Sequence, residues 1–276
     1  MRIDAHQHYW RIERGDYGWI TPEIPVLYRD FVPSDLNPLL IKHDLDGSIV
    51  IQAAPTIDET EYLLELAADH SSILGVVGWL DLFDPNHRRH FERFCQHEKF
   101  LGFRITIQEM SDSSRILEED FINALRVYEE EDVPVDLLVL SSQLEHTVQL
   151  LHQVPHLRGV IDHIAKPRVR DMEMDSWLAA MREIAAFPNM YCKLSGIVTE
   201  GDHLNWKAQD FIPYIHHVLQ LFGPDRLMFG SDWPVCLMAA EYDEVLQLLE
   251  ESLPSQWGES ERNKLFGLNA KTFYKI

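Results

Sequence analysis

The chain has few cysteines and no long apolar run. Its 276 residues include three cysteines, Cys95, Cys192 and Cys236, which lie far apart and form no CxxC pair. An odd number of distant cysteines indicates reduced thiols. The first predicted strand follows Met1 directly, which leaves no room for a signal peptide, so we expect a cytoplasmic protein. Its uncharged apolar stretches are far shorter than the roughly 18 residues of a membrane span, so we expect no membrane-spanning segment.

Positive charge is scarce as well. The chain has 24 lysines and arginines against 45 aspartates and glutamates, which gives a formal net charge of −21. This balance argues against nucleic acid or an anionic membrane surface as the main partner, because both are negatively charged. It does not restrict a small-molecule substrate, since a pocket can be locally positive. Hydrophobic residues make up 46% and charged residues 25% of the chain, as in an ordinary globular protein, and we expect one domain over residues 1–276.

Short apolar runs alternate with segments of helical periodicity. We predict strands at 2–8, 45–54, 73–81, 100–108, 133–140, 158–165, 189–195 and 226–232. Apolar residues three and four apart predict helices between them, around 57–67, 121–128, 144–151, 177–184, 215–222 and 242–249. Eight such alternations favour an α/β fold of the (β/α)8 TIM barrel type in a single domain. A doubly wound sheet also alternates, but it usually has fewer strands and a glycine-rich first turn, which this chain lacks.

The connection between the first two predicted strands is unusually long. From Tyr9 to about Pro33 it shows no clear periodicity, and it contains the aromatic residues Trp10, Tyr17, Trp19, Tyr28 and Phe31. Long connections of this kind are usually functional loops or lids. Two interpretations stay open, an aromatic plug over the barrel mouth and a substrate lid. Exposed aromatic residues here could also contact a partner subunit, so a homo-oligomer is open too.

Polar residues end several predicted strands, where a parallel barrel has its active site. Because side chains alternate along a strand, we expect Asp4, His6 and His8 on one face of the first strand and Ile3 and Ala5 on the other. Two histidines two residues apart near a strand end can hold one metal ion. The alternative is that both only form structural hydrogen bonds.

The last predicted strand ends in an acid. Asp232 lies between Gly230-Ser231 and Trp233-Pro234, where a turn aspartate would be ordinary. The functional interpretation is a general base that accepts a proton from water. His163, at the end of the sixth predicted strand, would reach the same barrel mouth as the two histidines of the first strand. We therefore predict Asp232 and His163 as catalytic residues.

Inward-facing polar residues on other strands complete a candidate substrate site. Arg104 should meet a protein carboxylate or a polar substrate group, because a buried unpaired arginine is strongly disfavoured. We predict substrate contacts from residues within, at or just after predicted strand ends, namely Gln52, Trp79, Arg104, Lys166 and Lys193. No serine or cysteine stands out as an activated nucleophile, which favours direct attack by water.

Taken together, these motifs resemble the amidohydrolase superfamily, and within it the amidohydrolase-2 branch of predicted metal-dependent barrel hydrolases that includes sugar lactonases. The segments that carry the resemblance are 4–8, 102–104, 162–167, 192–196, 229–234 and 269–274. The resemblance implies one divalent metal ion, with zinc favoured, held by His6, His8, His163 and Asp232. Some lactonases of this type work without a metal, so the ion's necessity stays open. Superfamily members often have a lysine or glutamate ligand on strand four and a histidine on strand five, where this chain offers Arg104 and Asp136; we therefore expect no binuclear centre.

The function we expect from this resemblance is hydrolysis of a sugar-derived or similarly polar lactone. Asp232 would deprotonate a water that attacks the lactone carbonyl, while His163, Arg104 or a metal would stabilise the oxyanion. One alternative is a metal-dependent decarboxylase of an aromatic or unsaturated acid on the same barrel, which the missing strand-five histidine disfavours. Another is a barrel without catalytic activity that binds a small polyol or acid.

Overall fold

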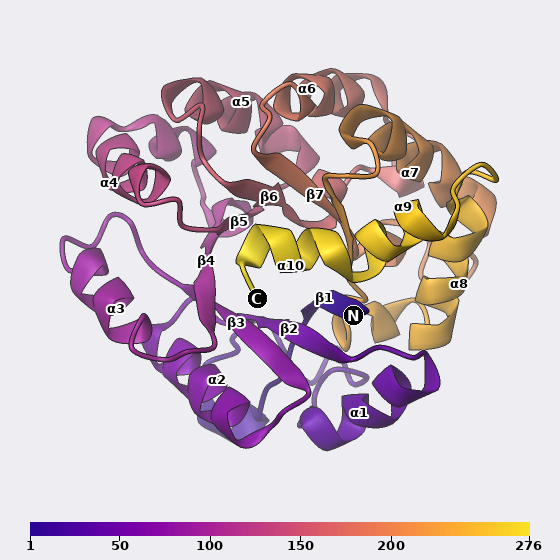
Figure 1. Ribbon diagram of the computed structural model, residues 1–276, viewed down its shortest axis with the longest axis horizontal. Helices are drawn as coiled ribbons and strands as arrows, with labels where there is room; N and C mark the ends of the chain where they lie inside the picture. Colours follow the sequence, from indigo (N-terminus) through magenta and orange to yellow (C-terminus); the bar gives the residue numbers. More distant parts are fainter.

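A ring of eight parallel strands surrounded by helices forms the centre of the computed structural model, which describes residues 1–276 (Figure 1). The strands neighbour one another in chain order, and all eight predicted strands are present with shorter bounds: β1 Ile3–Gln7, β2 Gly47–Ile51, β3 Ile73–Trp79, β4 Phe100–Thr106, β5 Val135–Leu138, β6 Gly159–Ile161, β7 Met190–Leu194 and β8 Leu227–Phe229. This order confirms the (β/α)8 barrel, because the strand order of a doubly wound sheet reverses at a switch point.

Helices cover the outside of the ring. They are α1 Pro33–Lys42, α2 Ile57–Asp69, α3 His87–Phe94, α4 Glu119–Glu130, α5 Leu144–Gln153, α6 Asp175–Ala185, α7 Ala208–Phe222, α8 Tyr242–Ser252, α9 Glu259–Asn263 and α10 Asn269–Tyr274. The six predicted helices correspond to α2 and α4 to α8. Outward-facing strand residues such as Ile105, Leu137 and Leu194 pack against them in an apolar cluster of 71 buried residues. None of the ten helices combines the length and the apolar character that crossing a membrane would require.

Two backbone hydrogen bonds join the segment after β8 to β1 and close the ring. The amide of Asp232 donates to the carbonyl of His6 at 2.8 Å, and the amide of His8 donates to the carbonyl of Trp233 at 2.8 Å. The two ends of the barrel sequence, which carry the predicted histidines and the predicted base, are therefore held directly against each other.

A β-bulge in β1 changes which of its side chains face the barrel interior. The register of β1 against β2 shifts between Asp4 and Gln7. Before the shift, Ile3 and Ala5 pack in the interior cluster, and after it His6 also turns inward. The prediction that Asp4 shares a face with the two histidines is therefore wrong, because an extra residue in a strand reverses the alternation beyond it.

The carboxylate of Asp4 instead faces outward and stabilises the seam between the first and last strands. It accepts a hydrogen bond from the amide of Ser231 at 2.9 Å and one from the hydroxyl of Tyr242, on α8, at 3.0 Å. Asp4 thereby fixes the turn that leads into Asp232.

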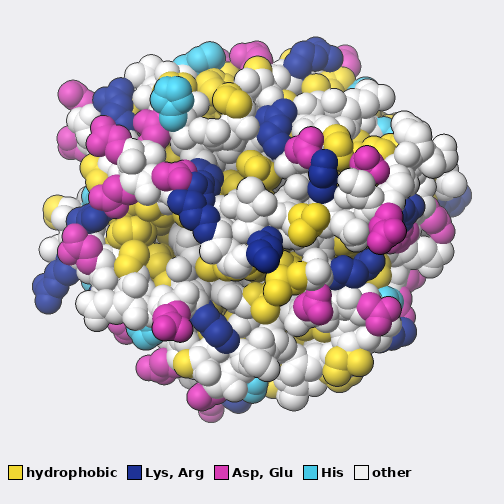
Figure 2. Space-filling view, viewed as in Figure 1, with side chains coloured by type: hydrophobic (Ala, Val, Ile, Leu, Met, Phe, Trp, Pro, Cys, Tyr) yellow, Lys and Arg dark blue, Asp and Glu magenta, His cyan; other side chains and the backbone are white.

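The helix α10 covers the amino-terminal end of the barrel (Figure 1). Its residues Phe273 and Tyr274 pack with interior residues of the strands, and the hydroxyl of Tyr274 donates to Asp136 Oδ1 at 2.7 Å. Acidic and basic side chains are interspersed over this face (Figure 2). The active-site end predicted from the strand directions is the opposite one.

The long segment after β1 divides into a buried part and a part that borders a cavity. Trp10 and Phe31 are fully buried, and their backbones exchange two hydrogen bonds of 3.0 Å. Trp19 is 37% exposed, and its indole nitrogen donates to the carbonyl of Ala53 at 2.8 Å. Trp10 and Phe31 thus pack in the interior of the protein, and Trp19 lines the cavity described below.

Candidate active site

Three imidazole rings surround one carboxylate oxygen at the carboxyl-terminal end of the barrel. Asp232 Oδ1 lies 3.3 Å from His8 Nε2, 3.7 Å from His6 Nε2 and 3.8 Å from His163 Nε2. His6 lies on β1 and His8 directly after it, His163 lies in the turn after β6, and the aspartate follows β8. The structure therefore brings together all four residues predicted for catalysis and metal binding.

The outer nitrogen of His8 has a fixed partner. His8 Nδ1 lies 2.8 Å from the carbonyl oxygen of Ile51, which can only accept, so Nδ1 carries a proton. In a neutral ring the lone pair of Nε2 then points at the carboxylate of Asp232, 3.3 Å away. Two acceptors at this distance require a proton or a cation between them.

Burial lowers the pKa of both other histidines. Burial lowers the pKa of His6 well below its ordinary value, and the charge of Lys193 lowers it further. Burial also lowers the pKa of His163 well below its ordinary value, although Asp232 opposes this shift. His6 Nε2 is buried and has no hydrogen-bond partner. Neutral imidazole nitrogens of this kind are the commonest metal ligands.

Asp232 is ionised at neutral pH in this surrounding. Its burial disfavours the charged form, but the neighbouring His163, His8 and Lys166 outweigh burial and hold the pKa of Asp232 below its ordinary value. A buried, ionised carboxylate can accept a proton from water or ligate a metal cation.

The turn that presents His163 has an unusual backbone. Four consecutive residues have left-handed dihedral angles, with φ of 53° at His163, 47° at Ile164, 61° at Ala165 and 45° at Lys166. The indole of Trp177 donates to the carbonyl of Ile164 at 2.7 Å and supports the turn. This conformation is disfavoured for residues other than glycine, and in return it directs both His163 and Lys166 into the same cavity.

The segment after β7 supports His163 from behind. The hydroxyl of Ser195 lies 2.9 Å from His163 Nδ1. Gly196 has a φ of 61°, and a Cβ atom there would lie 2.4 Å from His163 Nδ1 and 3.0 Å from Asp232 Oδ2. The sequence analysis assigned no role to Ser195 or Gly196. Their roles depend on contact with His163, and such a contact produces no periodic pattern in the sequence.

A layer of buried charges lies beneath the histidines. Lys193 forms an ion pair with Asp136, and its Nζ lies 3.2 Å from Asp162 Oδ1 and 3.2 Å from His6 Nδ1. Burial disfavours the charged form of Asp162, but Lys193 and Arg104 outweigh it and lower the pKa. Burial raises the pKa of Asp136 to about 6 against the pull of Lys193. Lys193 is fully buried, so the structure places it as a support for His6 and Asp162 rather than in the cavity wall where a substrate contact was expected.

Arg104 is both part of this layer and part of the cavity wall. Its Nη1 lies 3.4 Å from Asp162 Oδ2, and its Nη2 donates to the carbonyl of Gln52. Its Nε is buried without a hydrogen-bond partner. The expectation of a carboxylate partner is thus met by Asp162. Of the other predicted contacts, the side chains of Gln52 and Trp79 do not line the cavity.

A cavity of about 510 Å³ opens above the three histidines. Of the predicted residues, His8, Arg104, His163, Lys166 and Asp232 line it. The remaining wall comes from residues that the sequence reasoning did not assign, namely Asp16, Gly18, Trp19, Ala53, Pro55, Gln108, Glu109, Leu138, Val235 and Met238.

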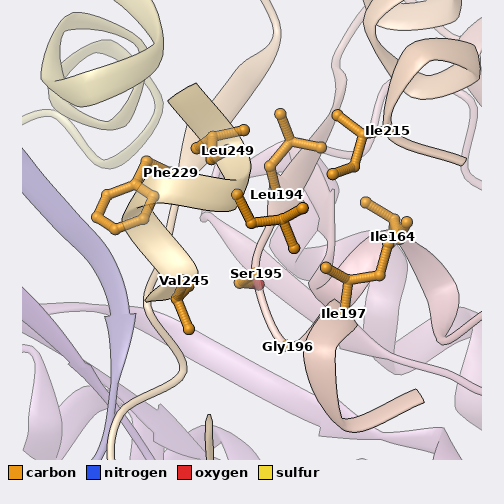
Figure 3. Close-up of a pocket in the computed structure, with 10 residues that line it drawn as sticks. Ile164, Leu194, Ser195, Gly196, Ile197, Ile215, Phe229, Val245 and Leu249 are labelled. Atoms are coloured by element: carbon orange, nitrogen blue, oxygen red, sulfur yellow. The ribbon is translucent and has the colours of Figure 1, made fainter. Parts of the chain in front are cut away.

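A second, much smaller cavity lies outside the barrel wall, between β7 and β8 and the helices α7 and α8 (Figure 3). Its volume is about 20 Å³, room for about one water molecule. Its lining is mainly apolar, with residues such as Leu194, Phe229 and Leu249, and it offers no titratable side chain. The large cavity is therefore the candidate active site.

A parallel barrel with two histidines on its first strand, one after its sixth and an aspartate after its last defines an enzyme of the amidohydrolase class. The model of the amidohydrolase family matches residues 3–276, and the chain belongs to this family.

Named relatives refine this placement. The chain is 39% identical over 289 aligned residues to an L-fucono-1,5-lactonase of Burkholderia multivorans, covering 100% of this chain and 96% of that protein. A crystal structure of an amidohydrolase from Burkholderia multivorans with bound zinc matches with a TM-score of 0.94 at 39% identity, covering 100% of this chain and 99% of the other. A 2,6-dihydroxybenzoate decarboxylase from Rhizobium matches with a TM-score of 0.69 over 99% of this chain and 98% of the other, but at 15% identity it shows the fold alone.

Proposed function

We propose that this protein is a hydrolase that opens a sugar lactone of the L-fucono type to its open-chain hydroxy acid. The main support is the carboxylate of Asp232 at the wall of the large cavity, with three imidazole nitrogens within 3.8 Å of one of its oxygens. The full-length likeness to L-fucono-1,5-lactonase supports the substrate class.

Asp232 acts as the base in this proposal. It takes a proton from a water molecule as the water oxygen attacks the lactone carbonyl carbon. Arg104, whose side chain lies in the cavity wall, donates to the carbonyl oxygen as negative charge develops there. The bond from the carbonyl carbon to the ring oxygen then breaks, and the proton held by Asp232 passes to that oxygen.

His6, His8, His163 and Asp232 fit a single divalent ion, and we propose zinc. The fit rests on His6 Nε2, which is buried without a partner, and on His8 Nε2, which lies 3.3 Å from Asp232 Oδ1. A bound ion would supply Lewis-acid polarisation of the carbonyl and would lower the pKa of a coordinated water.

The direct test compares Asp232→Asn with wild type on an L-sugar 1,5-lactone, following acid release with a pH indicator. We expect a loss of at least about a hundredfold in kcat, since removing a general base typically costs 10² to 10⁴. Asp69→Asn is the matched control, because Asp69 is exposed at the end of α2, far from the site in sequence and structure. Wild-type turnover by Asp232→Asn would overturn the role of the base. A lactone panel without turnover, combined with ligand-induced thermal stabilisation, would favour a binding barrel instead.

Metal content is measured on the same preparations. We expect about one zinc per chain in wild type, and loss of zinc and of activity in His6→Ala, with the fold retained. Full activity of wild type after exhaustive chelation would contradict the proposed metal while leaving Asp232 as the base.

A further inference from the structure

The cations that line the large cavity already have protein counter-charges. Arg104 is paired with Asp162 at 3.4 Å, and Lys166 Nζ lies 3.7 Å from Glu200 Oε1. At the rim, Asp16 is paired with Arg14 at 2.6 Å. A substrate carboxylate would therefore compete with an existing ion pair for every lysine or arginine in the wall.

The hydrogen-bond acceptors on the same wall are in the opposite situation. Gln108 Oε1 is buried and has no hydrogen-bond partner. Glu109 is exposed, its side chain also lines the cavity, and its carboxylate forms no ion pair with a protein group; partial burial raises its pKa, and the charge of Arg104 opposes this shift. A buried acceptor without a donor, as at Gln108, is disfavoured by the full loss of its hydration, so a ligand that brings donors restores the hydrogen bond that the protein leaves unmet there.

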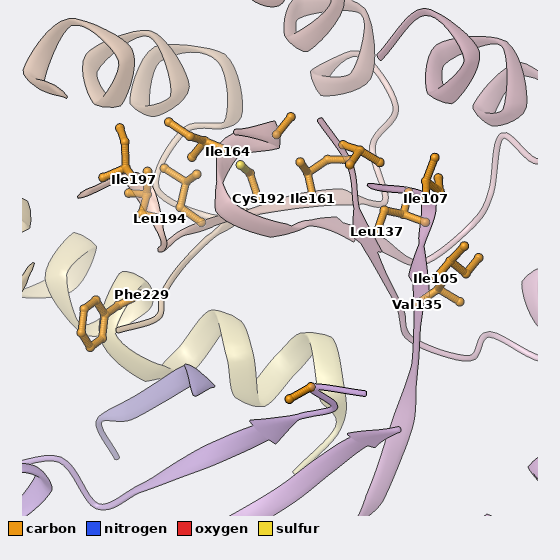
Figure 4. Close-up of a cluster of buried hydrophobic side chains, with 14 of the residues drawn as sticks. Ile105, Ile107, Val135, Leu137, Ile161, Ile164, Cys192, Leu194, Ile197 and Phe229 are labelled. Carbon is orange, nitrogen blue, oxygen red and sulfur yellow. The ribbon is translucent and has the colours of Figure 1, made fainter. Parts of the chain in front are cut away.

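The backbone that carries these two acceptors is rigidly held. Gln108 and Glu109 belong to the short 3-10 turn Ile107–Glu109 directly after β4. Ile107 and Ile105 pack outward in the apolar cluster behind the strand (Figure 4), and the carbonyl of Ile107 accepts a hydrogen bond of 3.0 Å from the buried side chain of Gln143. The two acceptors are thus presented to the cavity from a fixed support.

We propose that Gln108 and Glu109 accept hydrogen bonds from hydroxyl groups of the substrate and make the enzyme selective for uncharged polyhydroxylated lactones over lactones that carry a carboxylate. This proposal rests on the lactonase function proposed above. Hydroxyl groups supply the donors that the wall lacks, whereas a carboxylate supplies only acceptors and negative charge next to Glu109. A site built to bind hydroxyl groups discriminates strongly against ligands that lack them, because its polar groups are then left unpaired.

The test measures kcat/KM for three substrates of one ring size: a neutral aldono-1,5-lactone, its counterpart with a terminal carboxylate, and unsubstituted δ-valerolactone. In wild type we expect the neutral polyhydroxylated lactone to be preferred. Glu109→Gln should lower kcat/KM for it about tenfold, mainly through KM, since hydrogen bonds to charged groups are the stronger ones. The same variant should raise kcat/KM for the carboxylate-bearing lactone about fivefold, because a like charge is removed.

Gln108→Leu provides an independent variant. It removes the buried acceptor and should lower kcat/KM for the neutral polyhydroxylated lactone about fivefold while leaving δ-valerolactone unchanged. Glu98→Gln is the matched control, because Glu98 is exposed just before β4 at the opposite end of the same strand. Thermal melting checks that all variants are folded.

The outcomes separate the two proposals. Wild type that opens none of the lactones overturns the lactonase function and this inference with it. Wild type that opens the neutral and carboxylate-bearing lactones equally well, or Glu109→Gln that changes both by the same factor, overturns only the selectivity assigned to Gln108 and Glu109.

Discussion

His163 Nδ1 lies 2.9 Å from the hydroxyl of Ser195, on the side of the ring opposite to Nε2, which faces Asp232. Serine, histidine and aspartate in contact would ordinarily indicate a serine nucleophile activated by a base. Here Ser195 does not line the large cavity, and it borders the small apolar cavity behind β7 instead. Ser195 therefore fixes the orientation of the His163 ring.

The first prediction concerns this hydrogen bond. Ser195→Ala should lower kcat about tenfold or somewhat more, as loss of an outer hydrogen bond to a ligand or catalytic histidine typically does, and it should leave KM nearly unchanged. Pre-steady-state kinetics should show no acyl-enzyme burst in either protein. A loss as large as that of Asp232→Asn, or a burst in wild type, would point to a nucleophilic serine.

The second prediction concerns Gly196. Gly196→Ala should lower activity by at least about a hundredfold, because the added Cβ would meet His163 Nδ1 at 2.4 Å and displace both His163 and Asp232. The matched control is Gly223→Ala, at a φ of 64° with no atom within 4 Å of the new Cβ. Both variants place alanine at a positive φ, with the greater backbone strain at Gly223, whose ψ is −179° against 5° at Gly196, so both melting temperatures should fall, and only Gly196→Ala should lose activity. Equal activity of the two would show that the contact with His163 is unimportant.

The third prediction separates two roles for Lys193. Lys193→Met leaves Asp136 and Asp162 buried without this counter-charge, so we expect the free energy of unfolding to fall by about 3 to 5 kcal/mol. The double variant Lys193→Met with Asp136→Leu should recover part of this loss, because one uncompensated charge is removed. Chemical denaturation measures both. Unchanged stability with a raised KM would instead assign Lys193 to substrate binding.

The fourth prediction concerns pH and Glu59, which is fully buried near the start of α2 and accepts a hydrogen bond of 2.8 Å from the amide of Ala53. Burial raises the pKa of Glu59 from 4.5 to about 8. Between these values the folded protein keeps a proton that the unfolded chain releases, so stability falls as pH rises through this window. The total fall is at most about 5 kcal/mol.

Glu59→Gln should remove this part of the pH dependence while keeping an acceptor for Ala53. Urea denaturation at pH 5 and at pH 8.5 measures the difference in free energy of unfolding for each protein. Identical pH slopes in wild type and variant would contradict the raised pKa.

The strands, and the meeting of the site residues at one end of the barrel, could be predicted because both follow from the repeated alternation of strands and helices. Eight apolar runs gave the barrel, and the direction of parallel strands placed His163 and Asp232 at one end. The alternation rule failed at Asp4, since a bulge depends on the pairing of β1 with β2 and leaves no mark in the apolar pattern. The helix α3 was not predicted because Phe91 and Phe94 are its only buried residues.

Other features depend on contacts that a sequence does not display. The left-handed turn at residues 163–166 contains no glycine, so composition gives no sign of it. The burial of Lys193 follows from the two aspartates beside it, which come from β5 and from the turn after β6. The role proposed for Gln108 and Glu109 rests on their lack of protein partners. Only a structure shows which polar groups lack a partner.

The closure between β1 and β8 has a consequence for how this protein becomes active. His8 and Asp232, which share a contact, are 224 positions apart in the chain, so their meeting must await nearly complete synthesis and the ordering of everything between them. A chain that lacks either end lacks one of these two residues and therefore cannot assemble the site. Catalytic activity therefore requires a chain that is intact from His8 to Asp232.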